Sequence, residues 1–182
     1  MIHFVTTSDG KYREVANLLH GYGIKIERER LPVPEIQADT SEEVVRYSLD
    51  VLAGLTANDV LVDDSGFYVN ALNGFPGVFS AYTYRTIGTR GLLRLLEGAQ
   101  DRSSRFETVM GLRLGKEVRV FKGECHGVVA AEPHGAEGFG FDPIFVPDGE
   151  VRTFAEMPIT EKNAISHRGN AAKKVAEFLQ GR

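Results

Sequence analysis

Two neighbouring carboxylates, Asp63 and Asp64, follow a short apolar run from Val60 to Val62. Carboxylates at the end of a buried strand are costly unless cations pair with them or a metal binds them. Successive strand side chains point to opposite faces, so we expect only one of the two to face a cleft, and alternation alone does not say which. The simpler alternative is a turn or helix cap, because Asp, Ser65 and Gly66 are turn-forming residues.

A second candidate is the polar segment Thr6-Thr7-Ser8-Asp9-Gly10-Lys11, which separates a predicted strand from a predicted helix. Backbone N–H groups at a helix start favour anions, and Lys11 would add a positive charge. The segment lacks the spaced glycines and the Lys-Ser/Thr pair of a Walker A loop. Taken alone, it is explained as simply by a capped helix with a solvated lysine.

Two further positions could contact a ligand. Phe139 stands between Gly138 and Gly140, which suits either a stacking face for a flat ligand or a plain core anchor. His167 and Arg168 follow Ser166, a good N-cap, and cations in a first helical turn oppose the helix dipole. An anionic or hydrogen-bond-accepting ligand nearby would explain that placement.

The pattern of apolar residues predicts an α/β protein with a mixed sheet, because helix-linked and hairpin-linked strands both occur. A capping box at Thr40–Glu43 predicts a helix start, and Gly115-Lys116 predicts a hairpin turn. Predicted strands cover residues 2–6, 24–31, 60–62, 67–72, 105–114, 118–120 and 128–131, and predicted helices follow residues 11 and 40, lie around 92–96, and follow 166.

Composition narrows the classes of function. The chain has 182 residues, which suits a single domain over 1–182, and its formal net charge of −4 offers no overall basic field for nucleic acid or an anionic membrane. The one cysteine, Cys125, fits a small buried strand residue and a reducing, cytoplasmic setting. No apolar run approaches the length of a membrane span.

Four blocks in this order resemble the inosine/xanthosine triphosphate pyrophosphatase family, which hydrolyses non-standard purine nucleoside triphosphates. Together they extend over nearly the whole chain. The blocks are Thr6 to Lys11; Asp63-Asp64-Ser65-Gly66 with Gly74-Phe75-Pro76-Gly77 and Ser80-Ala81; Gly138 to Phe145; and Glu161-Lys162-Asn163 with Ser166-His167-Arg168.

The resemblance implies a homodimer with a long mixed sheet, two lobes and a central cleft. It implies Mg²⁺-dependent release of pyrophosphate from ITP, dITP or XTP, with Mn²⁺ as a possible substitute metal. Activated water would attack the α-phosphorus, with Asp64 as general base. The resemblance further implies that Glu35 and Asp64 hold the metal and that the substrate contacts Thr6, Thr7, Ser8, Asp9, Gly10, Lys11, Ser65, Phe139, Gly140, Phe141, Asp142, Lys162, His167 and Arg168.

Three positions depart from the usual family pattern. Ser8 stands where asparagine is common, Asp63 replaces a glutamate, and Phe141 replaces a tyrosine. These departures bear on contacts and leave the reaction unchanged. Considered without the resemblance, Glu35 between Pro34 and Ile36 is simply a solvated loop carboxylate.

Hydrogen bonding to the purine base can explain how such a site would select its substrates. Inosine and xanthosine present a 6-keto acceptor, whereas adenine presents a 6-amino donor, so fixed donors in the pocket would reject adenine. Guanine shares the 6-keto group, and its rejection must depend on the 2-position. One alternative is a Maf-like pyrophosphatase for modified nucleotides, which the block from Lys162 to Arg168 disfavours. Another is a non-catalytic nucleotide sensor, which Glu35 and Asp64 disfavour. A third is a plain structural domain, which would leave the acidic pair and the cations at the helix start unexplained.

Overall fold

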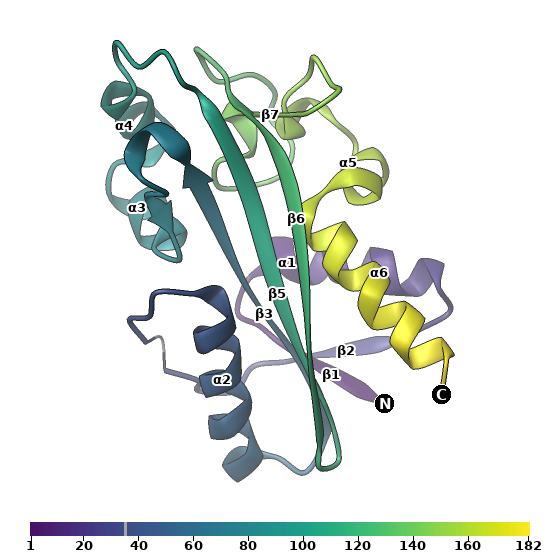
Figure 1. The fold of residues 1–182 in the computed structure, drawn as a ribbon. Helices are drawn as coiled ribbons and strands as arrows, with labels where there is room; N and C mark the ends of the chain where they lie inside the picture. Colours follow the sequence, from purple (N-terminus) through teal and green to yellow (C-terminus); the bar gives the residue numbers. More distant parts are fainter. Residues whose placement is uncertain (35) are drawn as a thin grey trace.

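The computed structural model describes residues 1–34 and 36–182. Within these ranges, seven strands form one mixed sheet in the order β2-β1-β3-β5-β6-β7, with β4 beside β3 (Figure 1). The parallel pairs join β1 to β2 and β3, and the remaining pairs are antiparallel. The strands are β1 (Ile2–Val5), β2 (Ile26–Glu29), β3 (Asp59–Val69), β4 (Pro76–Gly77), β5 (Ser103–Leu114), β6 (Glu117–Val129) and β7 (Phe145–Pro147).

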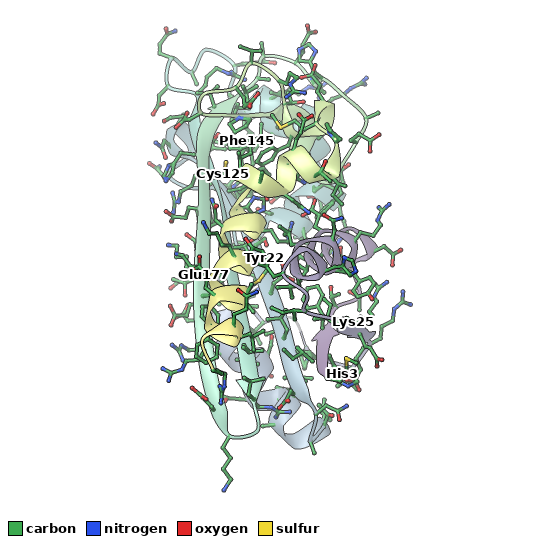
Figure 2. The ribbon with its side chains drawn as sticks, turned by 90° about the vertical axis from the view of Figure 1, so that its right-hand side faces the viewer. His3, Tyr22, Lys25, Cys125, Phe145 and Glu177 are labelled. Atoms are coloured by element: carbon green, nitrogen blue, oxygen red, sulfur yellow. The ribbon has the colours of Figure 1, made fainter. Side chains whose placement is uncertain are left out.

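Helices cover both faces of this sheet. Helices α1 and α6 pack on one face and α2 packs on the other, while α3 and α4 lie toward the opposite end of the molecule from α2 (Figure 1). In the second view, α6 runs along the sheet, with Cys125 and Phe145 near its start and Glu177 on its later turns (Figure 2). The helices are α1 (Asp9–Gly21), α2 (Ser41–Leu55), α3 (Ser80–Thr86), α4 (Gly88–Leu95), α5 (Ile159–Ile165) and α6 (His167–Gln180), with 3-10 turns at Asn70–Leu72, Asp142–Ile144 and Phe154–Glu156.

The mixed sheet is confirmed, but the prediction that its central strand breaks at Asp63 and Asp64 was wrong. Strand β3 continues from Asp59 to Val69, because β5 pairs with it from Val60 to Val69 without interruption. The alternation across this strand holds through the acidic pair. The two carboxylates therefore lie on opposite faces, as predicted, but both line the cavity described below, so the expectation that only one would face a cleft was wrong.

Several other boundaries differ from the predictions. The expected segments 118–120 and 128–131 are joined in one strand, β6, which ends at Val129, because the long hairpin with β5 keeps its register throughout. Helices α3 and α5 were not predicted, because each has only 7 residues, too few to show a helical spacing of apolar residues. The capping box at Thr40 and the N-cap at Ser166 are confirmed.

The buried apolar residues form separate clusters at the two ends of the sheet. One cluster joins Phe67, Phe106, Phe145 and Leu92 at the α4 and β7 end. At the other end, Leu61 and Met110 pack against α1 and α6, while Val60, Val62 and Val109 pack against α2. Two packed regions thus flank the middle of β3. Among the described residues, no helix combines the length and apolar character that crossing a membrane requires.

The start of α6 lies directly on the backbone of β6 at Gly123. A Cβ atom at this position would lie 2.2 Å from the carbonyl oxygen of His167 and 2.4 Å from the amide nitrogen of Ala171. Both neighbours are backbone atoms, so neither can move without displacing the helix. This contact sets how deeply the first turn of α6 enters the molecule.

We expect Gly123→Ala to lower the free energy of unfolding by about 1–3 kcal/mol, because the added methyl overpacks α6 against the sheet. Denaturant titration of the variant beside the parent protein measures this loss. Gly54→Ala is the matched control, because Gly54 lies in α2 with nothing within 4 Å of the added Cβ. A Gly123→Ala protein as stable as the control would contradict the close packing.

Candidate active site

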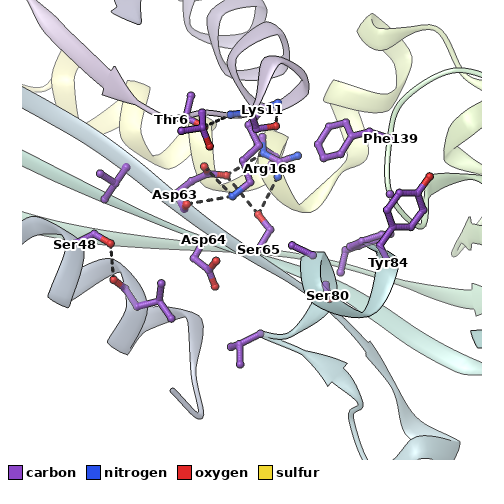
Figure 3. Close-up of a pocket in the computed structure, with 18 of the residues that line it drawn as sticks. Thr6, Lys11, Ser48, Asp63, Asp64, Ser65, Ser80, Tyr84, Phe139 and Arg168 are labelled. Carbon is purple, nitrogen blue, oxygen red and sulfur yellow. Dashed lines mark hydrogen bonds and ion pairs between the residues drawn. The ribbon is translucent and has the colours of Figure 1, made fainter. Parts of the chain in front are cut away.

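A cavity of about 520 Å³ opens at the middle of β3, between the two packed regions. Its walls come from the segment after β1, from α2, from α3, from the loop at Phe139–Asp142 and from the first turn of α6. In Figure 3, Thr6, Lys11 and Arg168 lie on one side of Asp63 and Asp64, and Ser80 lies on the other. A volume of this size suits a small-molecule ligand.

Asp63 points into a pair of cations. Lys11 Nζ lies 3.2 Å from Asp63 Oδ1 and also donates to the Asp63 carbonyl oxygen at 3.2 Å. Arg168 Nε donates to Asp63 Oδ2 at 3.2 Å. Burial works to raise the pKa of Asp63, but Lys11 and Arg168 outweigh it and hold that pKa below its usual value. Asp63 is therefore an ionised structural anchor.

The same cations belong to a larger buried network. Lys162 Nζ lies 2.7 Å from Glu14 Oε1 and 2.6 Å from Asp142 Oδ2, and Arg168 also pairs with Glu14. The network contains three cations and three carboxylates, so its formal charges cancel. It ties α1, β3, the 3-10 turn at Asp142, α5 and α6 together. The members are Lys11, Glu14, Asp63, Asp142, Lys162 and Arg168.

Burial in this network shifts the carboxyl groups in different directions. Burial opposes ionisation of Glu14, but Arg168 and Lys162 overcome it and lower the pKa of Glu14. For Asp142, burial dominates and raises the pKa, although Lys162 acts against it. Two cations thus favour the ionised form of Glu14, whereas burial and the neighbouring charge of Glu14 disfavour that of Asp142.

Asp64 lies on the opposite face of β3 and has a different environment. Its Oδ2 atom is buried and has no hydrogen-bond partner among the residues that the structure describes. Burial raises the pKa of Asp64 despite the nearby charge of Lys11. A buried carboxylate oxygen without a partner is costly, and a metal ion or an ordered water would satisfy it.

The segment after β1 leads into a capped helix start at the cavity wall. Ser8 caps α1 by accepting from the Lys11 amide at 3.2 Å, and Ser8 N donates to Thr6 Oγ1 at 3.1 Å. Thr6, Thr7, Ser8 and Lys11 all line the cavity. The helix start, its dipole and the Lys11 ammonium therefore face the same space as Asp64.

The wall formed by Phe139 is aromatic and partly open. Its ring is 38 % exposed, with Lys162 Nζ 5.2 Å and Arg168 Cζ 5.5 Å from the ring centroid. A Cβ at Gly10 would meet the ring at 2.5 Å, so α1 supports the ring closely. His167 is buried and stacks on Phe106 with centroids 4.6 Å apart. The open face of Phe139 can stack on a flat ligand.

Comparison with known proteins connects this cavity to a family. A model of the Ham1 family matches residues 2–178. The chain belongs to the Ham1 family. The dITP/XTP pyrophosphatases of Pyrococcus horikoshii and Thermococcus kodakarensis are 46% and 47% identical, covering 98% and 97% of this chain and 96% of each relative. The structure of a HAM1 protein from Coxiella burnetii matches with a TM-score of 0.85 at 33% identity, covering 100% of this chain and 98% of that one.

Most residues expected to contact substrate in this Ham1 chain line the cavity. They are Thr6, Thr7, Ser8, Lys11, Asp64, Ser65, Phe139, Gly140, Phe141, Asp142, His167 and Arg168. Asp9 instead points away and pairs with Arg28, Gly10 supports Phe139, and Lys162 lies beneath the lining at 2 % exposure. Glu35, expected to bind metal, lies outside the described residues.

The placement of cations at the start of α6 has an internal explanation in this Ham1 structure. Arg168 pairs with Glu14 and Asp63, so the protein supplies the anions that we expected from a ligand. Burial, with Arg168 next in effect, keeps the pKa of His167 well below its usual value, and the imidazole is neutral. The helix dipole therefore opposes one cation, which two carboxylates stabilise.

Glu14, which pairs with the two cations that flank Phe139, was not predicted from the sequence. The sequence feature that could have indicated it is its position next to Val15 on the buried side of α1, where a charged side chain needs a partner. Tyr84 and Arg85 of α3 also line the cavity and were not candidates. The apolar residues of this segment show no clear helical spacing, so the sequence alone does not indicate that it forms a wall of the cavity.

We expect Glu14→Gln to lower the free energy of unfolding at pH 7 by about 3–5 kcal/mol, since the buried cations Lys162 and Arg168 each lose one of their two carboxylates. The pKa of Glu14 is lowered from 4.5, so its stabilising effect is fully present above about pH 4.5 and is lost as the pH falls through the lowered value. Urea titrations across this pH range measure the effect.

Glu42→Gln in α2 is the control, because Glu42 pairs with Arg46 on the surface and its side chain is 51% exposed. Such a pair contributes about 0–1 kcal/mol. Equal losses in the two variants, or a loss at Glu14 that persists unchanged at pH 3, would contradict the buried network.

Proposed function

We propose that this chain hydrolyses non-standard purine nucleoside triphosphates, dITP, ITP and XTP, to the monophosphate and pyrophosphate. The names of its relatives, dITP/XTP pyrophosphatases that match almost the full length, support this activity. The observation that carries it is one cavity that brings together Asp64, the capped start of α1 with Lys11, and the half-open ring of Phe139. These three parts suit a reacting phosphorus, a polyphosphate and a purine.

Asp64 is proposed as the general base. Among the described residues, no ion pair engages Asp64, and burial raises its pKa, which makes it the stronger base of the acidic pair. Its side chain would orient a water and take its proton as the water attacks the α-phosphorus in line with the leaving pyrophosphate. Asp63 is less suited to this role, because Lys11 and Arg168 lower its pKa, which makes it a weaker base, and both cations pair with its oxygens.

Lys11 and the backbone at the start of α1 are proposed to stabilise the departing pyrophosphate. N–H groups and an ammonium that are already fixed act on developing charge without reorganisation. Ser65 lies next to Asp64 and within hydrogen-bond distance of Thr108, 2.7 Å, and Arg168, 2.9 Å. Its hydroxyl is held rigidly and can contact the substrate near the reacting bond.

Mg²⁺ fits this donor set, with Mn²⁺ as a substitute, because Mg²⁺ prefers few protein carboxylates together with phosphate oxygens and waters. The orphaned Oδ2 of Asp64 is the observed feature that supports it. Asp64 and Glu35 are the proposed ligands. When bound, the metal would neutralise phosphate charge that this acidic chain leaves uncompensated.

The base is proposed to stack on Phe139, with His167, Arg168, Phe141 and Asp142 around it. His167 is neutral and buried, and its Nδ1 atom lacks a partner within the described part of the chain. A neutral imidazole can donate one hydrogen bond and accept another. Fixed donors at this end would satisfy a 6-keto group and would be left unpaired by adenine, at about 1–3 kcal/mol for each group.

We also propose that residues 1–182 act as one domain in a cytoplasmic homodimer. The dimer follows from the family resemblance, and the reducing compartment is consistent with the buried thiol of Cys125, whose pKa burial raises to about 12. Exposed apolar side chains along α3 and α4, including Tyr82, Leu95 and Ile87 at their junction, are compatible with a contact between subunits.

The proposed activity is tested with a panel of ITP, dITP, XTP, ATP and GTP, assayed for pyrophosphate with Mg²⁺ and with EDTA. We expect release from ITP, dITP and XTP to exceed that from ATP and GTP by about 100-fold or more, since several unpaired donors would disfavour adenine. EDTA should abolish the reaction. Comparable rates on all substrates would refute the selectivity, and binding without turnover would indicate a sensor.

Asp64→Asn should reduce kcat by about 100-fold or more, because the amide cannot accept the proton from water. Binding of ITP should change much less, because the stacking wall and the anion site remain. Asp50→Asn in α2 is the matched control, since Asp50 is exposed and outside the cavity lining. An active Asp64→Asn enzyme would show that the base is misassigned.

A further inference from the structure

Arg85 is a cation in the cavity wall that the function proposed above does not use. It lies in the last turn of α3, one helical turn after Ala81, and both residues line the cavity. The neighbouring Tyr84 meets the ring of Phe141 edge-on, with centroids 5.5 Å apart. This contact fixes the helix against the loop that forms the proposed base wall.

The other cations at the cavity are already committed to carboxylates. Lys11 pairs with Asp63, and Arg168 pairs with Asp63 and Glu14. No ion pair or hydrogen bond of the Arg85 side chain is found within residues 1–34 and 36–182. Its guanidinium is thus the cavity cation that a ligand can engage without breaking a contact described here.

The charge of the proposed substrate calls for such a group. The six-member network is neutral by itself, so it contributes little net attraction for a polyphosphate. One divalent cation does not neutralise a triphosphate, and the remaining negative charge is concentrated on its pyrophosphate half. An arginine that is not engaged elsewhere can bind two phosphate oxygens at once through its planar guanidinium.

A simpler explanation is that Arg85 stabilises the C-terminal end of α3 through the helix dipole. That effect requires a cation in the last turn but does not require it to line the cavity. Arg90 in α4 is also exposed but lies outside the cavity lining. Comparing substitutions at Arg85 and Arg90 therefore distinguishes the effect of a ligand contact from that of surface charge in general.

We propose that Arg85 binds the β- and γ-phosphates of the substrate, opposing the anion site at Lys11 from the α3 wall. This inference rests on the proposed pyrophosphatase activity and adds a substrate-binding residue to it. Arg85 would hold the leaving pyrophosphate from α3 while α1 holds it from the other wall. It makes no contact with the base.

The test compares the Kd values of two ligands in the presence of Mg²⁺. One is an ITP analogue with a non-cleavable α,β-methylene bridge, and the other is IMP, which lacks the β- and γ-phosphates. Arg85→Gln should weaken binding of the analogue by about 10-fold to 100-fold, the loss expected for charge-assisted hydrogen bonds. Its affinity for IMP should change less than about 2-fold, and Arg85→Lys should fall between the parent protein and Arg85→Gln.

Arg90→Gln is the charge-matched control and should leave both affinities unchanged. Equal weakening of the analogue and IMP by Arg85→Gln would place the contact at the base or sugar and overturn the proposal. Unchanged affinity for the analogue would overturn it as well. Failure of the unmodified protein to release pyrophosphate from ITP would instead refute the underlying function, so the two failures are distinguishable.

Discussion

The architecture of the site depends on the carboxylate of Asp63, which two cations from distant parts of the chain share. Lys11 comes from the first helix and Arg168 from the last, and both reach the middle strand. Glu14 closes the arrangement by pairing with Arg168 and with Lys162. Buried charges of this kind are stable only when each is compensated. The position of each element is thus constrained by the charges of the others.

This constraint separates two carboxylates that are adjacent in sequence. The alternation of a strand sends Asp63 into the network and Asp64 to the other face, where burial is not offset by a paired cation. Asp63 is engaged in the network, and Asp64 remains available for the catalytic role proposed above. Because the network is neutral, the proposed binding of a triphosphate to this acidic chain calls for a metal and for cations outside the network.

Local patterns in the sequence predicted the mixed sheet and the capped helices. Together with the family resemblance, they also predicted that Thr6, Asp64 and Phe139 contribute to the site. Patterns in sequence could not reveal that β3 continues through Asp63, because the pairing that carries it comes from β5, some forty residues later. Glu14 was missed because the role of a charged residue among apolar positions of a helix can be inferred only when its ion-pair partners are known. Arg85 was missed because α3 is a short helix whose orientation is set by its packing against the loop at Phe141.

The division of labour within the acidic pair is tested most directly by the unfolding free energies of Asp63→Asn and Asp64→Asn, measured side by side at pH 7. Removing the Asp63 charge leaves Lys11 without its carboxylate and the buried Arg168 with Glu14 alone, and it should cost about 3–5 kcal/mol. Removing the Asp64 charge relieves a desolvated carboxylate, so the protein should lose less than about 1 kcal/mol or gain stability. Equal losses at the two positions, or a larger loss at Asp64, would contradict the account.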